Sequence, residues 1–333
     1  PRQTADLMSM TVHEPSRSPK PSARDGFIIV AVLWILIALA TLASIYSIYI
    51  NNSALALSGM DDGLQAEALV SAGLELTAFR LTVPKDKDSD KDKDKNKDKE
   101  AQRPTRGQFA FRLGRANVTV NYSSETARID LNAAPKVLLA GFFAAIGAPN
   151  DDADRYADRI IGWRQRPKPM DQAGEAALYR SAGLPYLPRG APFAHASELW
   201  LVQGLPPELI RRALPFVTVY SGRPDINVFD APPELIAALP DMTPARLSTF
   251  LNQRDTVSRD KDSLSRLLGP DQPGATAEGS NAFRVKINIA FQNGWRTGSE
   301  AVILLDAADE PFQVLSWRND VDTDQPQIAT RRR

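Results

Sequence analysis

The 333-residue sequence predicts an α+β protein with one N-terminal transmembrane helix and a large all-helical insertion. Three observations lead to this prediction. A long uncharged apolar segment lies near the N-terminus, and alternating apolar segments flank a middle region of about 150 residues. That middle region is too long for a simple loop and contains a repeated helical pattern.

The overall composition is that of an ordinary globular protein, with 43% hydrophobic and 24% charged residues. Lys plus Arg (40) balance Asp plus Glu (40), so there is no global basic field to favour nucleic acid or anionic lipid. The absence of cysteine excludes disulfide scaffolds, thiolate zinc sites and iron–sulfur clusters. His13 and His195 are the only histidines, which argues against a histidine metal cluster or a catalytic triad.

The apolar segment near the N-terminus predicts a membrane-spanning helix. No charged side chain occurs in Gly26–Met60, and Phe27–Ile50 is almost continuously apolar. About 20 such residues cross the roughly 30 Å hydrocarbon core of a bilayer. Arg17, Lys20 and Arg24 precede the segment, so we expect a cytoplasmic N-terminus and the rest of the chain across the inner membrane, in the periplasm.

The helical pattern continues through Asn52–Leu81, and Pro84 is expected to end it. Apolar residues recur there at intervals of three and four, which predicts one stripe that packs on a sheet. The residues of this predicted stripe are Leu64, Ala68, Ala72, Leu76 and Phe79.

Lys85–Glu100 is a near-pure alternation of Lys with acidic residues and contains no apolar residue. It cannot offset its ordering entropy by burial, so we expect a solvated, disordered loop. Asp86, Asp88 and Asp90 have the spacing of the first ligands of an EF-hand calcium loop. However, Lys91 and Lys97 stand where that loop needs Gly and Glu, so the EF-hand interpretation fails.

Period-two alternation predicts two sets of strands. Gln108–Leu113 and Ala116–Tyr122 are separated by Gly114-Arg115, which is typical of a β-hairpin. The second set follows the middle region, with turns at Asn293-Gly294 and Ala308–Pro311. Its strands are expected at Phe283–Phe291, Glu300–Leu305 and Phe312–Trp317.

The middle region contains an internal repeat. Ile129–Pro135 (Ile-Asp-Leu-Asn-Ala-Ala-Pro) is echoed 97 residues later by Ile226–Pro232 (Ile-Asn-Val-Phe-Asp-Ala-Pro). The side chain of Asn132 or Asp230 is expected to cap the helix that starts at the nearby proline. We expect six or more short helices, in three pairs: Lys136–Ile146 with Ala153–Gln165, Ala196–Val202 with Pro207–Leu214, and Pro233–Leu239 with Pro244–Arg254.

The junction Arg24-Asp25-Gly26-Phe27 resembles the class III leader of type IV pilins and type II secretion pseudopilins. The resemblance implies that a prepilin peptidase cuts between Gly26 and Phe27 and methylates the new N-terminal Phe27. A cleaved secretory signal and an uncleaved anchor are the alternatives. Most members carry Glu at the fifth mature position, where this chain has Ala31. In the family this Glu pairs with the N-terminal amine of a neighbouring subunit. A carboxylate inside lipid costs several kcal/mol unless it is paired, and a subunit with no neighbour above it lacks that amine.

Several further motifs, taken in order, are similar to those of type II secretion system protein K, and the likeness runs from about Phe27 to Trp317. They are Arg128–Pro135, Ser197–Gly204, Leu214–Thr218, Ile226–Val228 and Ala231–Glu234. The resemblance implies a pilin-like α/β domain whose insertion has helix-hairpin-helix (SAM-like) repeats. It also implies a non-enzymatic minor pseudopilin that caps the pseudopilus tip and initiates its assembly. The implied partners are minor pseudopilins I, J and H, the prepilin peptidase and the inner-membrane assembly platform.

These observations divide the chain into six expected regions. They are a cytoplasmic leader (1–26), a transmembrane helix (27–50), the pilin-like helix with the first strands (51–128), the helical insertion (129–270), the C-terminal strands (271–319) and a tail (320–333).

The main alternative is a membrane-anchored helix-hairpin-helix protein of competence type that binds DNA. Such modules bind phosphate through backbone amides and basic side chains. Here Asp151, Asp152, Asp154 and Asp241 lie in the hairpins and would repel phosphate, so no nucleic-acid partner is expected. The nearby arginines are interleaved with acidic residues and are interpreted as a solvated face; they are Arg155, Arg159 and Arg164.

No catalytic residue is predicted. His195 has no partner visible in the sequence and is interpreted as a turn or capping residue, and Asp151 and Asp152 are interpreted as stabilising a helix N-terminus. No cofactor is expected, although the family resemblance makes calcium a possible ligand. An acidic C-terminal set offers oxygen ligands for it, with a solvated acidic surface as the competing interpretation. The candidates are Asp306, Asp309, Glu310, Asp320 and Asp322, together with Asp324.

Overall fold

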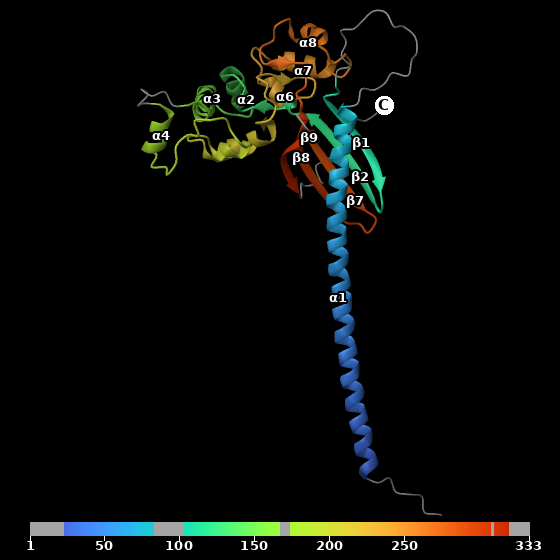
Figure 1. Ribbon diagram of the computed structural model, residues 1–333. Helices are drawn as coiled ribbons and strands as arrows, with labels where there is room; N and C mark the ends of the chain where they lie inside the picture. The colour runs from blue at the N-terminus through green and yellow to red at the C-terminus, as the bar shows by residue number, and fades with distance from the viewer. Residues whose placement is uncertain (1–22, 83–102, 167–173, 308–309, 320–333) are drawn as a thin grey trace, which may run out of the picture. The chain divides into compact units, whose positions relative to one another are not determined.

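The computed structural model describes residues 23–82, 103–166, 174–307 and 310–319, with side chains of 23–26 and 53–61 left out (Figure 1). The expected loop Lys85–Glu100 and the tail 320–333 lie outside the described residues. The chain divides into two compact units, Pro1–Gln65 and Ala66–Arg333.

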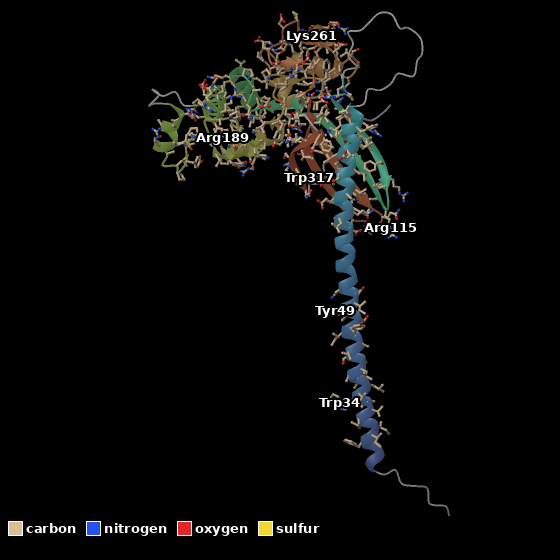
Figure 2. The ribbon with its side chains drawn as sticks, viewed as in Figure 1. Trp34, Tyr49, Arg115, Arg189, Lys261 and Trp317 are labelled. Carbon is tan, nitrogen blue, oxygen red and sulfur yellow. The ribbon has the colours of Figure 1, made fainter. Side chains whose placement is uncertain are left out.

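In the described residues, the first unit is the N-terminal part of helix α1 (Ala23–Thr82), as far as Gln65. Within it, Phe27–Asn52 is long and apolar enough to cross a membrane, with a mean hydropathy of 2.8 over 26 residues. At 1.5 Å per residue this length exceeds the roughly 30 Å hydrocarbon core. Its side chains, such as Trp34 and Tyr49, are exposed along the helix (Figure 2).

The second unit contains a five-stranded antiparallel sheet in the order β1-β2-β7-β8-β9. The predicted hairpin is present, since Leu113 pairs with Ala116 across the Gly114-Arg115 turn. The three later strands also lie where the alternation predicts them. The strands are β1 (Arg106–Leu113), β2 (Ala116–Ser124), β7 (Ala282–Phe291), β8 (Arg296–Ala307) and β9 (Glu310–Asn319).

The C-terminal part of α1 packs on one face of this sheet, as predicted, but with a different helix face from the predicted one. Leu64 and Phe79 of the predicted stripe are 68% and 61% exposed. Apolar residues occupy two adjacent faces of this helix, and the buried face is the one with Gly73. A Cβ at Gly73 would lie 3.0 Å from Cδ1 of Ile287, so glycine lets the helix approach the sheet closely. The buried positions are Ala66, Leu69, Val70, Gly73, Leu74, Thr77, Ala78 and Leu81.

The insertion occupies the connection between two neighbouring strands of the sheet. Ser124 at the end of β2 pairs with Phe283 at the start of β7, so the chain leaves and re-enters the sheet at the same place. Seven α-helices lie between them in the described residues, which confirms the predicted helical insertion. They are α2 (Lys136–Ala145), α3 (Asn150–Arg164), α4 (Glu175–Ser181), α5 (Pro207–Ala213), α6 (Pro233–Ala237), α7 (Pro244–Gln253) and α8 (Lys261–Leu268).

The insertion also contains two short parallel strand pairs that were not predicted. β3 (Ile129–Asp130) pairs with β4 (Val217–Thr218), and β5 (Ile226–Asn227) pairs with β6 (Ala275–Thr276). The two pairs start 97 residues apart, at the two copies of the sequence repeat. We call the part that begins at β3 the first module and the part that begins at β5 the second module.

The two modules share their turn chemistry. The side chain of Asp130 accepts a hydrogen bond from the backbone of Asn132 at 2.8 Å, and that of Asn227 accepts one from Phe229 at 3.0 Å. Both are Asx turns, in which a short polar side chain satisfies the backbone two residues further on. The hydroxyl of Thr276 likewise accepts from Glu278 at 3.1 Å, in the second module.

The predicted helix caps at these turns are wrong. Helices α2 and α6 begin after Pro135 and Pro232 without a side-chain cap. Asn132 instead exchanges two hydrogen bonds with the backbone of Phe193, at 2.7 and 3.0 Å. Proline itself fixes φ for helix entry, so the helix start needs no capping side chain.

Candidate functional site

The predicted cleavage junction lies at the start of α1. Gly26 and Phe27 are within the helix, and the Phe27 side chain is 76% exposed. Ala31 follows one turn later and is half-buried. The leader residues before Ala23 lie outside the described residues. Cleavage, methylation and the meaning of Ala31 therefore stay predictions.

The structure describes two of the acidic calcium candidates, Asp306 and Glu310. Asp306 has a positive φ of 59° and forms a 3.0 Å ion pair with Arg103. No group of three or more potential metal ligands occurs within the described part of the chain. The other four candidates lie outside the described residues; they are Asp309, Asp320, Asp322 and Asp324.

Helix α3 corrects the view of its arginines as a solvated face. Arg155 is exposed, but Arg164 is half-buried and donates to the carbonyl oxygens of Leu131 and Ala134, the latter at 2.8 Å. Arg254 makes the equivalent bond to Ala231 in the second module, at 2.8 Å. These guanidinium groups therefore hold the repeated turns in place. They are directed at protein carbonyls, which leaves them poorly suited to binding phosphate.

Arg159, the third of the predicted arginines on α3, and His195, the single described histidine, also have structural partners. Arg159 forms a 2.6 Å ion pair with Glu175, whose pKa is raised by burial. His195 caps the 3-10 helix Ala196–Leu201, because its Nδ1 accepts from the backbone of Ser197 at 3.1 Å. The predicted capping role of His195 is therefore confirmed.

A buried polar cluster joins the sheet to the insertion, and we call it the Arg284 cluster. The Glu125 carboxylate is fully buried and accepts from Nε and Nη2 of Arg284 at 2.8 and 3.0 Å. The hydroxyl of Thr218 on β4 also donates to Glu125. Nη1 of Arg284 contacts Glu300 on β8 at 2.6 Å, and Arg318 on β9 pairs with the same carboxylate.

Charge pairing sets the ionisation of this cluster. Burial alone would raise the pKa of Glu300, but Arg284, Arg318 and Lys286 outweigh it and hold the pKa at about 2. Burial likewise opposes ionisation of Glu125, yet Arg284 and Arg128 hold its pKa below the ordinary value. The two carboxylates in turn raise the pKa of Arg284 against the effect of burial. The cluster is thus a mutually paired set of charges.

A second cluster, the Asp230 cluster, lies where β1 begins. The Asp230 side chain is 1% exposed and belongs to the second module. Arg259 contacts it at 2.5 Å and Arg106 of β1 at 3.2 Å, and the hydroxyl of Thr105 donates to it. Asp255 extends the cluster, 3.6 Å from Arg106. Sequence reasoning missed both clusters because their members are far apart in the chain and form no motif.

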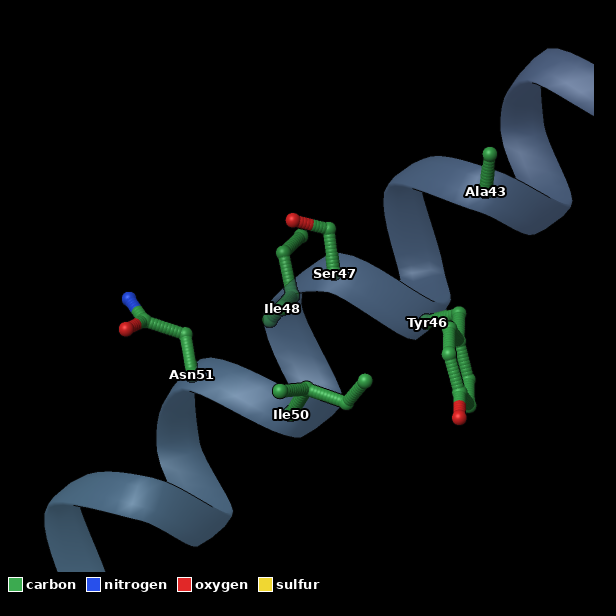
Figure 3. Close-up of a pocket in the computed structure, with 6 residues that line it drawn as sticks. All are labelled: Ala43, Tyr46, Ser47, Ile48, Ile50 and Asn51. Carbon is green, nitrogen blue, oxygen red and sulfur yellow. The ribbon is translucent and has the colours of Figure 1, made fainter.

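A shallow hollow lies on the surface of α1. It is lined by six residues of a single stretch of that helix, between Ala43 and Asn51 (Figure 3). All six come from one helix and lie within the apolar segment, so no second wall faces them. Such a surface suits lipid or another helix rather than a substrate.

Exposed apolar side chains outside the apolar segment occur on both α1 and the insertion. On α1, Phe79 is exposed and Leu76 is half-buried, next to the face that packs on the sheet. On the insertion, Val137 of α2 is 62% exposed and Trp200 is 43% exposed. The sheet adds Trp317 on its edge strand β9 (Figure 2).

Comparison with known protein families gives a direct sequence match. Residues 115–222 match the sequence model of the family described as type II secretion system (T2SS), protein K. This segment therefore resembles the protein K family in sequence. The match covers β2, the first module and the strand pair β3–β4, and the expected resemblance to protein K is confirmed.

A solved structure has the same fold. It is a chain of the GspK–GspI–GspJ complex from the type 2 secretion system of enterotoxigenic Escherichia coli. The likeness covers 79% of this chain and 99% of that chain, with a TM-score of 0.57 and 18% identity. The predicted α+β fold with its helical insertion is therefore confirmed. No curated protein sequence matches the chain.

Proposed function

We propose that this chain is a minor pseudopilin of a type II secretion system, which caps the tip of the periplasmic pseudopilus and initiates its assembly. The observation that carries the proposal is the match of residues 115–222 to the protein K family. The shared fold with a chain of the GspK–GspI–GspJ complex supports it. In this role the chain acts by assembly and has no catalytic activity.

The proposed topology places the apolar part of α1 in the inner membrane and the second unit in the periplasm. Prepilin peptidase removes the leader between Gly26 and Phe27 and methylates Phe27. Ala31 supports a terminal position, because a subunit without a neighbour above it would carry an unpaired carboxylate if it had Glu there. The insertion adds bulk that a subunit repeated along a filament would have to accommodate at every position.

The proposed partners are the minor pseudopilins I and J, with H and the inner-membrane assembly platform below them. The apolar residues Leu76 and Phe79, which we call the exposed stripe on α1, support a helix-packing contact with these partners. Phe79 is 61% exposed and Leu76 is half-buried beside it. Exposed apolar residues at this spacing on a helix are typical of a surface that another helix covers.

Deletion of the gene in its own host tests the proposal. We expect proteins that use the type II route to accumulate folded in the periplasm, and export to return when the full chain is supplied in trans. Normal export, combined with loss of DNA uptake, would instead support the competence-type DNA-binding alternative.

A further inference from the structure

We propose that the helical insertion is clamped rigidly onto the sheet at two points, one provided by each module, and that Glu125, Thr218 and Asp230 are the positioning residues of this clamp. The covalent connection alone would allow hinging. The chain crosses between sheet and insertion only twice, and both crossings lie at the adjacent ends of β2 and β7.

The first point of the clamp is made by the first module. Thr218 lies on β4 in that module and donates its hydroxyl hydrogen to Glu125, which directly follows β2. Arg284 of β7 holds the same carboxylate through two hydrogen bonds of 2.8 and 3.0 Å. The Glu125 side chain has no exposed surface, so water cannot replace these partners without the site opening.

The second point is made by the second module against edge strand β1 of the sheet. Asp230 follows β5 and its side chain is 1% exposed. Arg106 of β1 contacts that carboxylate at 3.2 Å. Strand β1 is an edge of the five-stranded sheet, whereas Arg284 lies on the central strand β7. The two contacts therefore hold the insertion at two separated strands and resist rotation about the crossing point.

The modules are also joined to each other, so that the two contacts act on one body. Gly141 of α2 in the first module faces the backbone of Ala238, just after α6 in the second. A Cβ at Gly141 would lie 2.1 Å from the Ala238 carbonyl oxygen, which shows how closely the two helices approach. Both modules share one buried apolar core that includes Phe142 and Phe229.

Distance measurements between spin labels on the full chain test the clamp. The sequence contains no cysteine, so Asn117→Cys on β2 with Val137→Cys reports the first module, and Asn117→Cys with Asn252→Cys reports the second. We expect one narrow distance distribution for each label pair in the otherwise unchanged protein.

The test variant is Thr218→Val with Asp230→Asn, which removes one donor and one charge while keeping side-chain shape. We expect both distributions to widen at least twofold. Lys136→Gln is the control, because its 2.7 Å pair with Asp158 is exposed and lies within the first module. It should leave both widths unchanged.

The proposal is overturned if the unchanged protein already gives broad distributions, or if the double variant keeps both of them narrow. Circular dichroism checks that the double variant is folded. If it is not folded, the single variant Asp230→Asn is measured with the Asn117/Asn252 label pair. The distance distribution of that pair must then widen for the proposal to stand.

Discussion

Glu125 and Arg284 form a bidentate ion pair across 159 residues of chain, with N–O distances of 2.8 and 3.0 Å. Glu125 directly follows β2, and Arg284 lies near the start of β7, so the pair closes the place where the insertion leaves the sheet. Arg284 also contacts Glu300 on β8 at 2.6 Å. One guanidinium therefore ties together two strands and the start of the insertion.

The ionisation of Glu300 predicts how stability depends on pH. Its pKa of about 2 in the folded protein lies below the ordinary value of 4.5. A lowered pKa contributes stability above about pH 4.5, and this contribution is lost as the pH falls towards 2. The shift corresponds to on the order of 3 kcal/mol.

Glu300→Gln should therefore lower the free energy of unfolding at pH 7 and flatten its decline between pH 4.5 and 2. Urea unfolding at several pH values measures both effects. Glu278→Gln is the control, because the Glu278 side chain is 62% exposed in its pair with Arg223. Parallel pH curves for the Glu300 variant and the unchanged protein would show that the pKa of Glu300 is not lowered in the folded protein.

The close approach of the two modules predicts that Gly141→Ala is destabilising. The added Cβ would meet the backbone oxygen of Ala238 at 2.1 Å, and backbone cannot move aside cheaply. Overpacking of this kind costs about 1–3 kcal/mol. Gly63→Ala is the matched control, because nothing lies within 4 Å of its added Cβ, and alanine favours the helix by up to about 1 kcal/mol. Equal unfolding free energies for the two variants would contradict the packing described.

The leader junction predicts that Gly26→Leu blocks processing. A peptidase must unwind the backbone at the cleavage site, and glycine makes this easier than leucine does. In cells with prepilin peptidase, mass spectrometry should find the unchanged chain starting at methylated Phe27 and the variant retaining its leader. A variant of mature size would mean that this bond is not the cleavage site.

The exposed stripe on α1 predicts that Phe79→Asp weakens binding to minor pseudopilins I and J at least tenfold, which is about 1.4 kcal/mol. The Phe79 side chain is 61% exposed, so the folded protein itself should lose little stability. Val137→Asp is the control, since Val137 is equally exposed but lies on the insertion. Titration calorimetry with purified I and J measures the affinity, and equal affinities for both variants would place the contact elsewhere.

Local patterns in the sequence predicted much of this fold, and the reasons for the failures are specific. Alternation located the strands, and the repeat located both modules, because these signals are local. The predicted face of α1 was wrong because Phe79 and its neighbours are as apolar as the buried face. The close approach of the helix to Ile287 at Gly73 is a tertiary feature that the local pattern does not contain. Arg164 was misread because its carbonyl acceptors, Leu131 and Ala134, are about 30 residues away.

The polar clusters could not be predicted for the same reason. Thr218, Glu125 and Arg284 become neighbours only in the folded chain, where β4 and β7 each bring one side chain to the residue that follows β2. Asp230 was assigned to the nearest helix start as a cap, since a capping role is the local expectation for aspartate before a helix. Its actual partners, Thr105 and Arg106, lie at the start of a distant strand.

The most direct test of the central claim is reconstitution of the tip complex. The full chain in detergent is mixed with minor pseudopilins I and J, and the mixture is separated by size-exclusion chromatography with light scattering. We predict one complex that contains each protein once. Separate elution of the chain from I and J, together with salt-sensitive binding of DNA by the chain, would contradict a pseudopilin role and favour the DNA-binding alternative.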